Sequence, residues 1–219
     1  MNIQLTADGS HTLYVPELDE HYHSVNGAVQ ESQHVYIRAG LNTCAKQKIN
    51  VLEYGFGTGL NAFLSLIEAS DKNLQIDYTT LEKYPLPESI TNQLNYAKEF
   101  PQKFHIYFKD ICNCPWNNLI PITDNFHIKK IQTDFSDFIF EKSYDVVYYD
   151  AFAPDKQKDV WSQEIFNKIF NHLNPEGILT TYCAKGVIRR MLQSAGFYVE
   201  RIPGPPGKRE MLRASKRIT

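Results

Sequence analysis

Hydrophobic positions follow two alternating patterns along the chain. Short apolar runs rich in Val, Ile and Tyr, as in residues 144–149, predict buried strands. Apolar residues three or four positions apart, as in residues 161–173, predict amphipathic helices. The segments expected to be strands are residues 3–6, 13–15, 49–54, 74–81, 104–108, 128–132, 144–149, 178–183, 197–202 and 210–215. The segments expected to be helices are residues 29–39, 60–68, 87–96, 161–173 and 186–195, and residues 174–177 are expected to form a turn.

The order of these segments indicates the type of sheet. Strands that alternate with helices favour a mainly parallel sheet covered on both faces. The last two strands are separated by a short loop around residues 203–207, and a parallel crossover needs more residues, so they are expected to be antiparallel. The predicted fold is α/β, a class I Rossmann-like methyltransferase fold with a mainly parallel, doubly wound sheet and one late antiparallel strand. Residues 1–219 are expected to form one domain, with residues 1–45 as an N-terminal extension near the substrate cleft.

Composition narrows the class of protein further. Hydrophobic residues make up 42% of the chain and charged residues 22%, as in soluble globular proteins. The first residues do not form a signal peptide, and no apolar run is long enough to span a bilayer. We therefore expect a cytoplasmic protein without membrane contact, whose four cysteines are reduced thiols.

The net charge of −2 conceals an uneven distribution along the chain. Residues 185–219 contain nine basic and two acidic side chains, which is the pattern that contact with phosphates requires. A solvated surface with an edge strand protected by charge would give the same pattern. Lys185, Lys208 and Arg209 are the candidates in this region for contact with a substrate, although Lys185 could equally be a surface lysine.

The strongest local motif is the glycine-rich segment of residues 53–59, Glu-Tyr-Gly-Phe-Gly-Thr-Gly, between a predicted strand and a predicted helix. Glycines allow the backbone to approach a ligand closely. Dinucleotide-binding loops typically have the spacing G-x-G-x-x-G, whereas this one is G-x-G-x-G with an acidic residue two positions earlier. That form suits a ligand without a pyrophosphate, so Glu53, Gly55, Gly57 and Gly59 are expected to bind S-adenosyl-L-methionine (SAM). A tight turn without a ligand is the alternative.

Two acidic residues follow the next predicted strands. Glu82 ends one of them, and its two carboxylate oxygens can accept hydrogen bonds from both hydroxyls of a ribose. Asp134 has a similar position and could accept a hydrogen bond from the adenine amino group. Asp110 is a rival for that role, and Asp137 could be a helix cap.

The candidate catalytic residue is Asp150, which follows an apolar strand and opens the sequence Asp-Ala-Phe-Ala-Pro. Ligands of open parallel sheets bind beyond the carboxyl ends of the strands. A carboxylate at that place could hold an amine or remove its proton during methyl transfer, and Phe152 could stack on a planar base. The segment is similar, in changed form, to the Asp/Asn-Pro-Pro-aromatic loop of amino-group methyltransferases. Capping of the following helix is the alternative for Asp150.

Other reactive residues carry weaker signals. Cys112 and Cys114 form a C-x-C pair, but the sequence offers no second pair at zinc spacing, so no metal is expected. His21 and His23 could lie on one face of a strand, where a partly exposed polar cluster is the commoner interpretation.

Several blocks together resemble one known family, the methyltransferase domain of the bifunctional tRNA 5-methylaminomethyl-2-thiouridine biosynthesis protein. The blocks are residues 52–61, 150–154 with Trp161, 207–212, the pair Asn26-Gly27, and Glu31. The resemblance covers nearly the whole chain. It implies transfer of a methyl group from SAM to the aminomethyl group of a modified wobble uridine, which turns 5-aminomethyl-2-thiouridine into 5-methylaminomethyl-2-thiouridine and leaves S-adenosyl-L-homocysteine.

The resemblance also implies roles for particular residues. Asp150 matches the Asp of the family's D-x-F-A-P block, and Gly55, Gly57 and Gly59 match its glycine loop. The expected partner is the anticodon loop of tRNA, contacted by Glu31, Phe152, Lys208 and Arg209. Lys185 is a further candidate for substrate contact, but it matches no shared residue of the family and its role stays open. A second glycine-rich nucleotide loop is absent from the sequence, so the chain resembles a stand-alone form that uses no FAD.

Three other functions remain open at this stage. An aminopropyltransferase would use a similar cleft but would not need RNA. A nicotinamide-dependent oxidoreductase would need the longer glycine spacing. An RNA-binding module without catalytic activity would bind tRNA but no cofactor.

Overall fold

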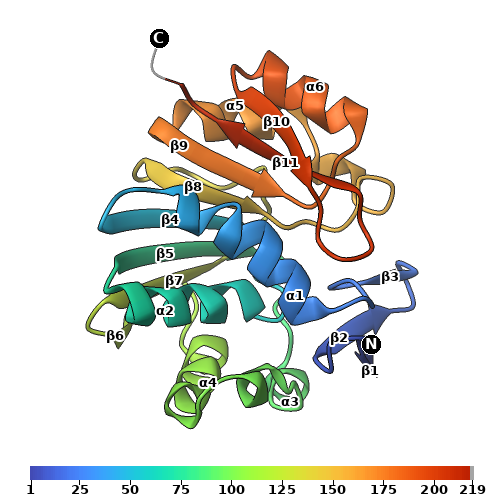
Figure 1. Ribbon diagram of the computed structural model, residues 1–219, viewed down its shortest axis with the longest axis vertical. Coiled ribbons are helices and arrows are strands. Elements are labelled where there is room, and N and C mark those ends of the chain that lie inside the picture. Colours follow the sequence, from blue (N-terminus) through green and yellow to red (C-terminus); the bar gives the residue numbers. More distant parts are fainter. Residues whose placement is uncertain (218–219) are drawn as a thin grey trace.

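The computed structural model describes residues 1–217, and an eight-stranded sheet lies at its centre (Figure 1). The strand order is β10-β11-β9-β8-β4-β5-β7-β6. These strands are β4 (Lys48–Tyr54), β5 (Gln75–Glu82), β6 (Leu119–Thr123), β7 (Phe126–Gln132), β8 (Tyr144–Tyr149), β9 (Leu173–Thr181), β10 (Tyr198–Pro203) and β11 (Glu210–Ser215). Strands β9, β8, β4, β5 and β7 pair in parallel, and β11 is antiparallel to both of its neighbours. The predicted sheet with one late antiparallel strand is therefore confirmed.

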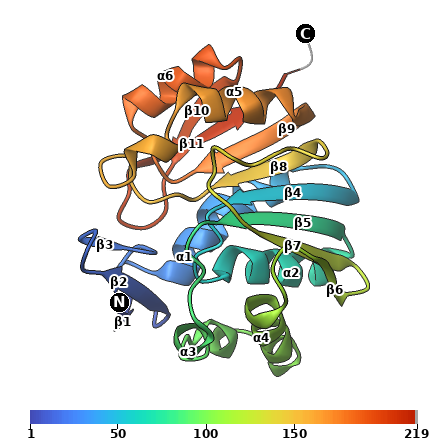
Figure 2. The same ribbon diagram turned by 180° about the vertical axis from the view of Figure 1, so that it is seen from behind.

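Helices cover both faces of this sheet. They are α1 (Ala28–Ser32), α2 (Leu60–Lys72), α3 (Glu88–Thr91), α4 (His105–Asn113), α5 (Gln163–Asn171) and α6 (Gly186–Ser194). Short 3₁₀ turns occupy Leu41–Thr43, Tyr96–Glu99, Gln102–Phe104 and Lys158–Val160, and a π-helical segment, Gln33–Arg38, continues α1. Figure 1 shows α1 and α2 in front of the sheet, and Figure 2 shows α5 on the opposite face.

Each face has its own hydrophobic core. One core packs Phe63 of α2 and Phe108 of α4 against the sheet, and the other packs Phe166 of α5 and Leu192 of α6 against the opposite side. All six residues of β8 are buried, because this central strand is covered on both faces. The sheet therefore places the carboxyl ends of β4 and β8 beside each other.

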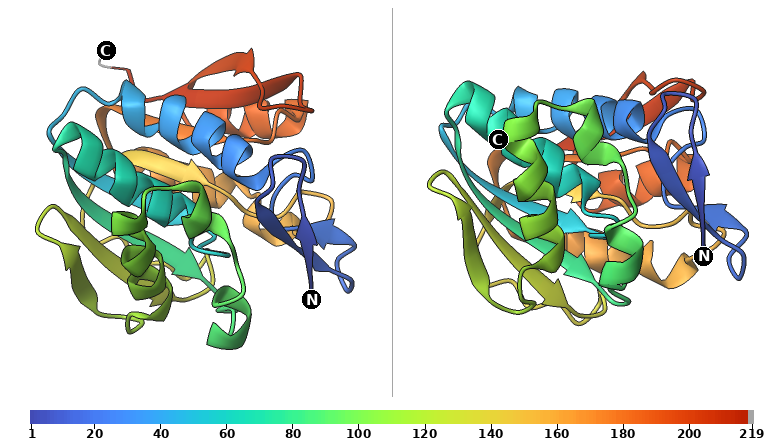
Figure 3. Two further views of the ribbon diagram at one scale, coloured as in Figure 1. Left: turned by 60° about the horizontal axis from the view of Figure 1, so that its bottom comes forward. Right: turned by 90° about the horizontal axis from the view of Figure 1, so that it is seen from below.

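The N-terminal residues form a second, smaller sheet. It contains β1 (Asn2–Leu5), β2 (His11–Val15) and β3 (Glu20–His21) in antiparallel order. Figure 3 shows this sheet beside the start of α1, at one end of the molecule. The chain then passes through α1 and its π-helical continuation before it enters the central sheet at β4.

Some predicted elements were wrong or incomplete. Residues 104–108 were expected to be a strand, but α4 begins at His105, and its buried residues Phe108 and Ile111 follow helical spacing. The predicted turn at residues 174–177 lies within β9, where the register against β8 shifts and Glu176 has a φ of 61°. The edge strand β6, which is antiparallel to β7, was not predicted. The helix predicted for residues 87–96 is shorter in the structure, where only α3 is α-helical.

Candidate active site

A cavity of about 750 Å³ opens at the carboxyl ends of β4, β5 and β8. Its wall comes mainly from the glycine loop after β4, the segment after β8 and residues of the N-terminal extension between Leu18 and Val25, and residues that follow β5, β7, β9 and β10 complete it. The predicted site residues in this wall are Glu31, Gly55, Gly57, Glu82, Asp134, Asp150, Phe152 and Lys208. The fold thus brings together residues that lie far apart in the sequence.

The glycine loop reaches its position because two residues lack a side chain. Gly55 has a φ of 97°, and a Cβ atom there would lie 2.6 Å from the backbone oxygen of Asp150. Gly57 has a φ of 51°, and a Cβ atom there would lie 3.1 Å from the ring of Tyr22. Both values of φ are unfavourable for residues with a Cβ atom. The loop can therefore lie directly against Asp150 and below Tyr22.

Glu53 lies behind the wall of the cavity. Its side chain is fully buried, and it accepts hydrogen bonds from Asn61 Nδ2 at 3.0 Å and from the Thr80 hydroxyl at 2.6 Å. Burial raises the pKa of Glu53 to about 8. Glu53 thereby joins β4, β5 and the first turn of α2 beneath the glycine loop. Gly59 also lies outside the cavity wall, and it is the residue that immediately precedes α2.

Glu82 and Asp134 line the part of the cavity beyond β5 and β7. The backbone N–H groups of Gly57 and Tyr84 donate to the two carboxylate oxygens of Glu82 at 3.1 and 2.9 Å. Asp134 accepts a hydrogen bond from Lys83 at 2.8 Å, and this contact keeps the pKa of Asp134 below its usual value. Glu82 thus joins the glycine loop to the end of β5.

The rival to Asp134, Asp110, lies on α4, and Asp137, the possible helix cap, precedes no helix, because the next helical turn begins at Lys158. Both stand outside the cavity wall formed by the described residues, 1–217. Asp134 therefore remains the candidate for contact with an adenine.

Asp150 follows β8 and is held by two donors. The Tyr36 hydroxyl donates to Asp150 Oδ1 at 2.5 Å, and Asn61 Nδ2 donates to Oδ2 at 2.7 Å. Burial raises the pKa of Asp150 to about 7, although both hydrogen bonds lower it. The carboxyl group can therefore accept or release a proton near neutral pH. Ser162, not Asp150, caps α5, so the capping alternative is wrong.

Two aromatic rings form another part of the cavity wall. Phe152 and Tyr22 meet edge to face with ring centroids 5.0 Å apart. The backbone oxygen of Phe152 accepts a hydrogen bond from the Trp161 indole at 2.7 Å, which fixes the segment after β8. A planar base could pack against these rings.

An ion pair joins the N-terminal extension to the loop between β10 and β11. Lys208 Nζ lies 2.6 Å from Glu31 Oε1 and 4.0 Å from the centroid of the Tyr182 ring. The other oxygen of Glu31 accepts a hydrogen bond from the backbone of Ser24 at 2.8 Å. His34 adds a contact to the backbone oxygen of Pro203 at 2.8 Å. Figure 1 shows this loop beside α1, where the two segments border the cavity.

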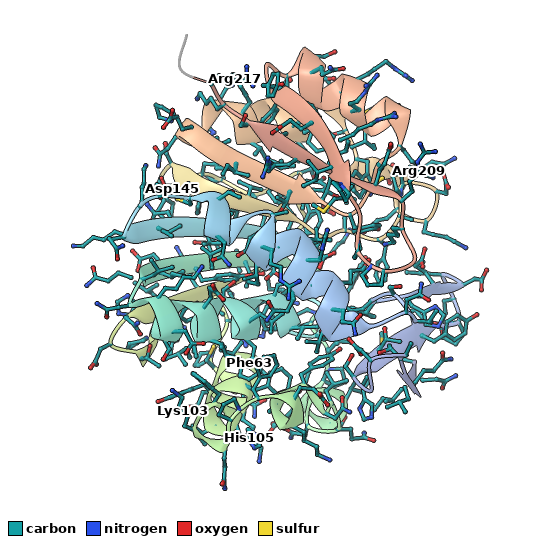
Figure 4. All side chains as sticks on the ribbon, in the orientation of Figure 1. Phe63, Lys103, His105, Asp145, Arg209 and Arg217 are labelled. Atoms are coloured by element: carbon teal, nitrogen blue, oxygen red, sulfur yellow. The ribbon has the colours of Figure 1, made fainter. Side chains whose placement is uncertain are left out.

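Two predicted substrate residues lie outside the cavity wall. Lys185 is paired with Asp155. Arg209 is 94% exposed, and Figure 4 shows it at the outer surface near the loop between β10 and β11. Five of the nine basic residues of the C-terminal region have acidic partners: the ion pairs are Lys185–Asp155, Arg201–Glu210, Lys208–Glu31, Arg213–Glu200 and, at the longest distance of 4.0 Å, Arg209–Glu210. The positive charge available to a phosphate is therefore smaller than the sequence suggests.

The histidines and cysteines noted in the sequence form no further reactive site among residues 1–217. His23 is buried, and burial lowers its pKa to about 4, so it is neutral near pH 7. Within residues 1–217, His, Cys, Asp and Glu side chains form no group of three or more that could hold a metal ion. No helix in the same range is long and apolar enough to cross a membrane.

Three contributors to the site were missed by sequence reasoning. Tyr36 and Tyr22 belong to the N-terminal extension and had no motif to mark them. Asn61 follows the glycine loop by two residues, within a block that carries the family resemblance, and its position at the start of a helix was a usable signal.

Taken together, the strand order, the glycine loop and the carboxyl group beyond β8 define a class I methyltransferase. The sequence model of the family described as S-adenosyl-L-methionine-dependent methyltransferase matches residues 80–217, more than half of the chain. The chain belongs to this family. The predicted fold class and enzyme class are confirmed.

Individual relatives agree with the predicted resemblance. The chain is 29% identical over 211 residues to the tRNA 5-methylaminomethyl-2-thiouridine biosynthesis bifunctional protein MnmC of Leptospira borgpetersenii serovar Hardjo-bovis (strain JB197). It is 28% identical over 213 residues to the protein of the same name from Campylobacter fetus subsp. fetus (strain 82-40). These alignments cover 89% and 93% of this chain but only 32% and 34% of the relatives, so the chain spans about a third of their length.

A solved structure shows the same fold over the full chain. The crystal structure of MNMC2 from Aquifex aeolicus superposes with a TM-score of 0.83 at 24% identity, and the match covers 100% of this chain and 71% of that one. The resemblance predicted from the sequence blocks is thereby confirmed for the methyltransferase domain.

The hydrogen bond from Tyr36 predicts a shift in the titration of Asp150. Because this bond lowers the pKa of Asp150, Tyr36→Phe should raise that pKa further above about 7. Carbon-13 NMR of the labelled carboxyl groups measures it. Tyr148→Phe is the matched control, since Tyr148 is equally buried, packs against Tyr36 and bonds Ser65. An unchanged pKa in Tyr36→Phe would show that the bond does not exist in solution.

Proposed function

We propose that this protein transfers a methyl group from SAM to the aminomethyl group of a modified wobble uridine in tRNA, which gives 5-methylaminomethyl-2-thiouridine and S-adenosyl-L-homocysteine. The names of the MnmC relatives support this substrate. The observation that carries the proposal is the Asp150 carboxyl group, held beside the glycine loop within one cavity. It is a proton acceptor for an amine at the place where the family binds its methyl donor.

The cavity residues fit the parts of SAM. Glu82 is placed to accept hydrogen bonds from the ribose hydroxyls, and Asp134 from the adenine amino group. Gly55 and Gly57 leave room for close approach of the methionine part, with Gly59 and the buried Glu53 supporting the loop. SAM supplies a methyl group on a positively charged sulfur, and the residues of the chain need neither FAD nor a metal to orient it.

Asp150 acts on the substrate amine. An amine is a nucleophile only when its lone pair is free, and most alkyl amines are protonated to ammonium ions near pH 7. With a pKa near 7, Asp150 can take a proton from the bound ammonium and hold a remaining N–H. The nitrogen lone pair then forms the new bond to the methyl carbon as the carbon–sulfur bond breaks and its electron pair stays on sulfur.

The mouth of the cavity suits a base presented on RNA. Phe152 and Tyr22 offer aromatic surface to the uracil ring, and Lys208 with Glu31 borders the same opening. Bases of an anticodon loop are unpaired, so inserting one costs less than opening a duplex. We place this reaction in the cytoplasm, where tRNA is available. Arg209 and Lys185 lie outside the cavity wall, where they can contact phosphates of the loop.

Replacement of Asp150 tests the assignment most simply. Asp150→Ala should lower the rate of methyl transfer to tRNA bearing 5-aminomethyl-2-thiouridine at least about 100-fold, because the amine loses its proton acceptor. Affinity for SAM should stay nearly unchanged, as measured by calorimetry. Asp155→Ala, an exposed acid of the same segment, is the matched control and should keep normal activity. A normal rate in Asp150→Ala contradicts the proposed role.

Arg209 provides a test of RNA contact. Arg209→Ala should weaken tRNA binding and reduce the slope of log K against log salt by about 1, because one phosphate contact is lost. Filter binding over a series of salt concentrations measures both quantities. Arg213→Ala should change the slope little, since Arg213 is 28% exposed and lies 3.3 Å from Glu200, whereas Arg209 is 94% exposed and its contact with Glu210 is 4.0 Å long. Equal slopes for the wild type and Arg209→Ala would remove this residue from the RNA-binding surface.

A further inference from the structure

Asn61 is fixed between two acidic side chains at the start of α2. It is 3% exposed, and its Nδ2 group donates to Glu53 Oε1 at 3.0 Å and to Asp150 Oδ2 at 2.7 Å. Because Nδ2 faces both carboxyl groups, Oδ1, the acceptor end of the amide, is the end left for another donor.

The oxygen of the same amide lacks a partner. Asn61 Oδ1 is buried and accepts no hydrogen bond from residues 1–217, although Asn61 belongs to the wall of the cavity. A buried acceptor without a donor costs about 1–3 kcal/mol, and native proteins rarely leave such a group unsatisfied. Oδ1 and Nδ2 are bonded to the same carbon, and Nδ2 contacts Asp150. The unsatisfied oxygen therefore lies close to the Asp150 carboxyl group.

We infer that Asn61 Oδ1 is a second acceptor for the substrate amine, beside Asp150. This inference rests on the proposed function. A neutral primary amine has two N–H groups and one lone pair. When Asp150 accepts one N–H and Asn61 Oδ1 the other, the lone pair is left free and has a fixed direction. Such orientation of the reacting atoms is a large part of catalysis of group transfer.

The same arrangement limits the reaction to one methyl group. Transfer adds the methyl group at the lone pair and gives a secondary ammonium that still has two N–H groups. To react again, this product must lose a proton, and the neutral secondary amine then has one N–H, so it can satisfy only one of the two acceptors while its lone pair faces a methyl donor. A second transfer would leave a buried acceptor facing the methyl group. Sites built to bond an N–H strongly reject analogues that lack it. Asn61 thus acts as a residue that determines both rate and product.

A competing partner for Asn61 Oδ1 is the ammonium group of SAM itself. The two possibilities differ in what a variant loses. Loss of a contact with SAM weakens SAM binding, whereas loss of a contact with the substrate amine lowers the rate of transfer and leaves SAM binding intact.

The experiment compares Asn61→Ala with the wild type on tRNA bearing 5-aminomethyl-2-thiouridine. The inference predicts a rate of transfer at least about 10-fold lower, SAM affinity close to that of the wild type by calorimetry, and a dimethylated nucleoside detectable by mass spectrometry. Asn61→Asp keeps an acceptor oxygen and should give only the monomethyl product. Ser65→Ala is the matched control: Ser65 is buried one turn further along α2, outside the cavity wall, and bonds the Asn61 backbone oxygen.

A measurement without any variant covers the case in which Asn61→Ala does not fold. The wild type should methylate tRNA that already carries the monomethyl group at least about 100-fold more slowly than tRNA with the primary amine. Equal rates on the two tRNAs overturn the inference, as does an Asn61→Ala enzyme with a normal rate, or one that loses SAM affinity alone. If the wild type methylates neither tRNA although it binds SAM, the proposed function fails instead.

Discussion

The site depends on the close approach of two neighbouring strand ends. Strands β4 and β8 are parallel and end at the same level, and the Asp150 backbone N–H donates to the Tyr54 oxygen at 2.9 Å. Immediately beyond, Gly55 lies so close to Asp150 that any Cβ atom would be 2.6 Å from its backbone oxygen. A larger residue at position 55 would force the glycine loop away from Asp150. In the proposed reaction, this contact sets the distance between methyl donor and amine.

Charge near that contact is controlled by burial. Glu53 and Asp150 have raised pKa values, about 8 and about 7, because burial withdraws both carboxyl groups from water, although the hydrogen bonds from their shared donor Asn61 lower both values. An acid whose pKa is higher in the folded than in the unfolded state stabilises the fold while it is protonated. This contribution is complete below pH about 4 and is lost as the pH rises through about 7 to 8. Near neutral pH the buried carboxyl groups therefore stabilise the fold less than at low pH, and in the same range Asp150 can accept a proton.

Most of the central sheet and half of the site could be predicted from the sequence. The glycine loop, Glu82 and Asp150 follow strands whose apolar patterns are clear, so their common location at one edge of the sheet followed from topology. Tyr36 and Tyr22 could not be found in this way, because they come from the N-terminal extension and reach the site only through tertiary packing. The helix α4 was missed because residues 104–108 look like a strand until Ile111 is included. Ion pairs also hide much of the basic charge that the composition suggested.

A crystal structure with S-adenosyl-L-homocysteine tests the central claim most directly. The account predicts that the ribose hydroxyls bond Glu82 and that the sulfur lies over the glycine loop, with open space between it and Asp150 for a methyl group and an amine. A ligand bound elsewhere, or one whose sulfur faces away from Asp150, would contradict it.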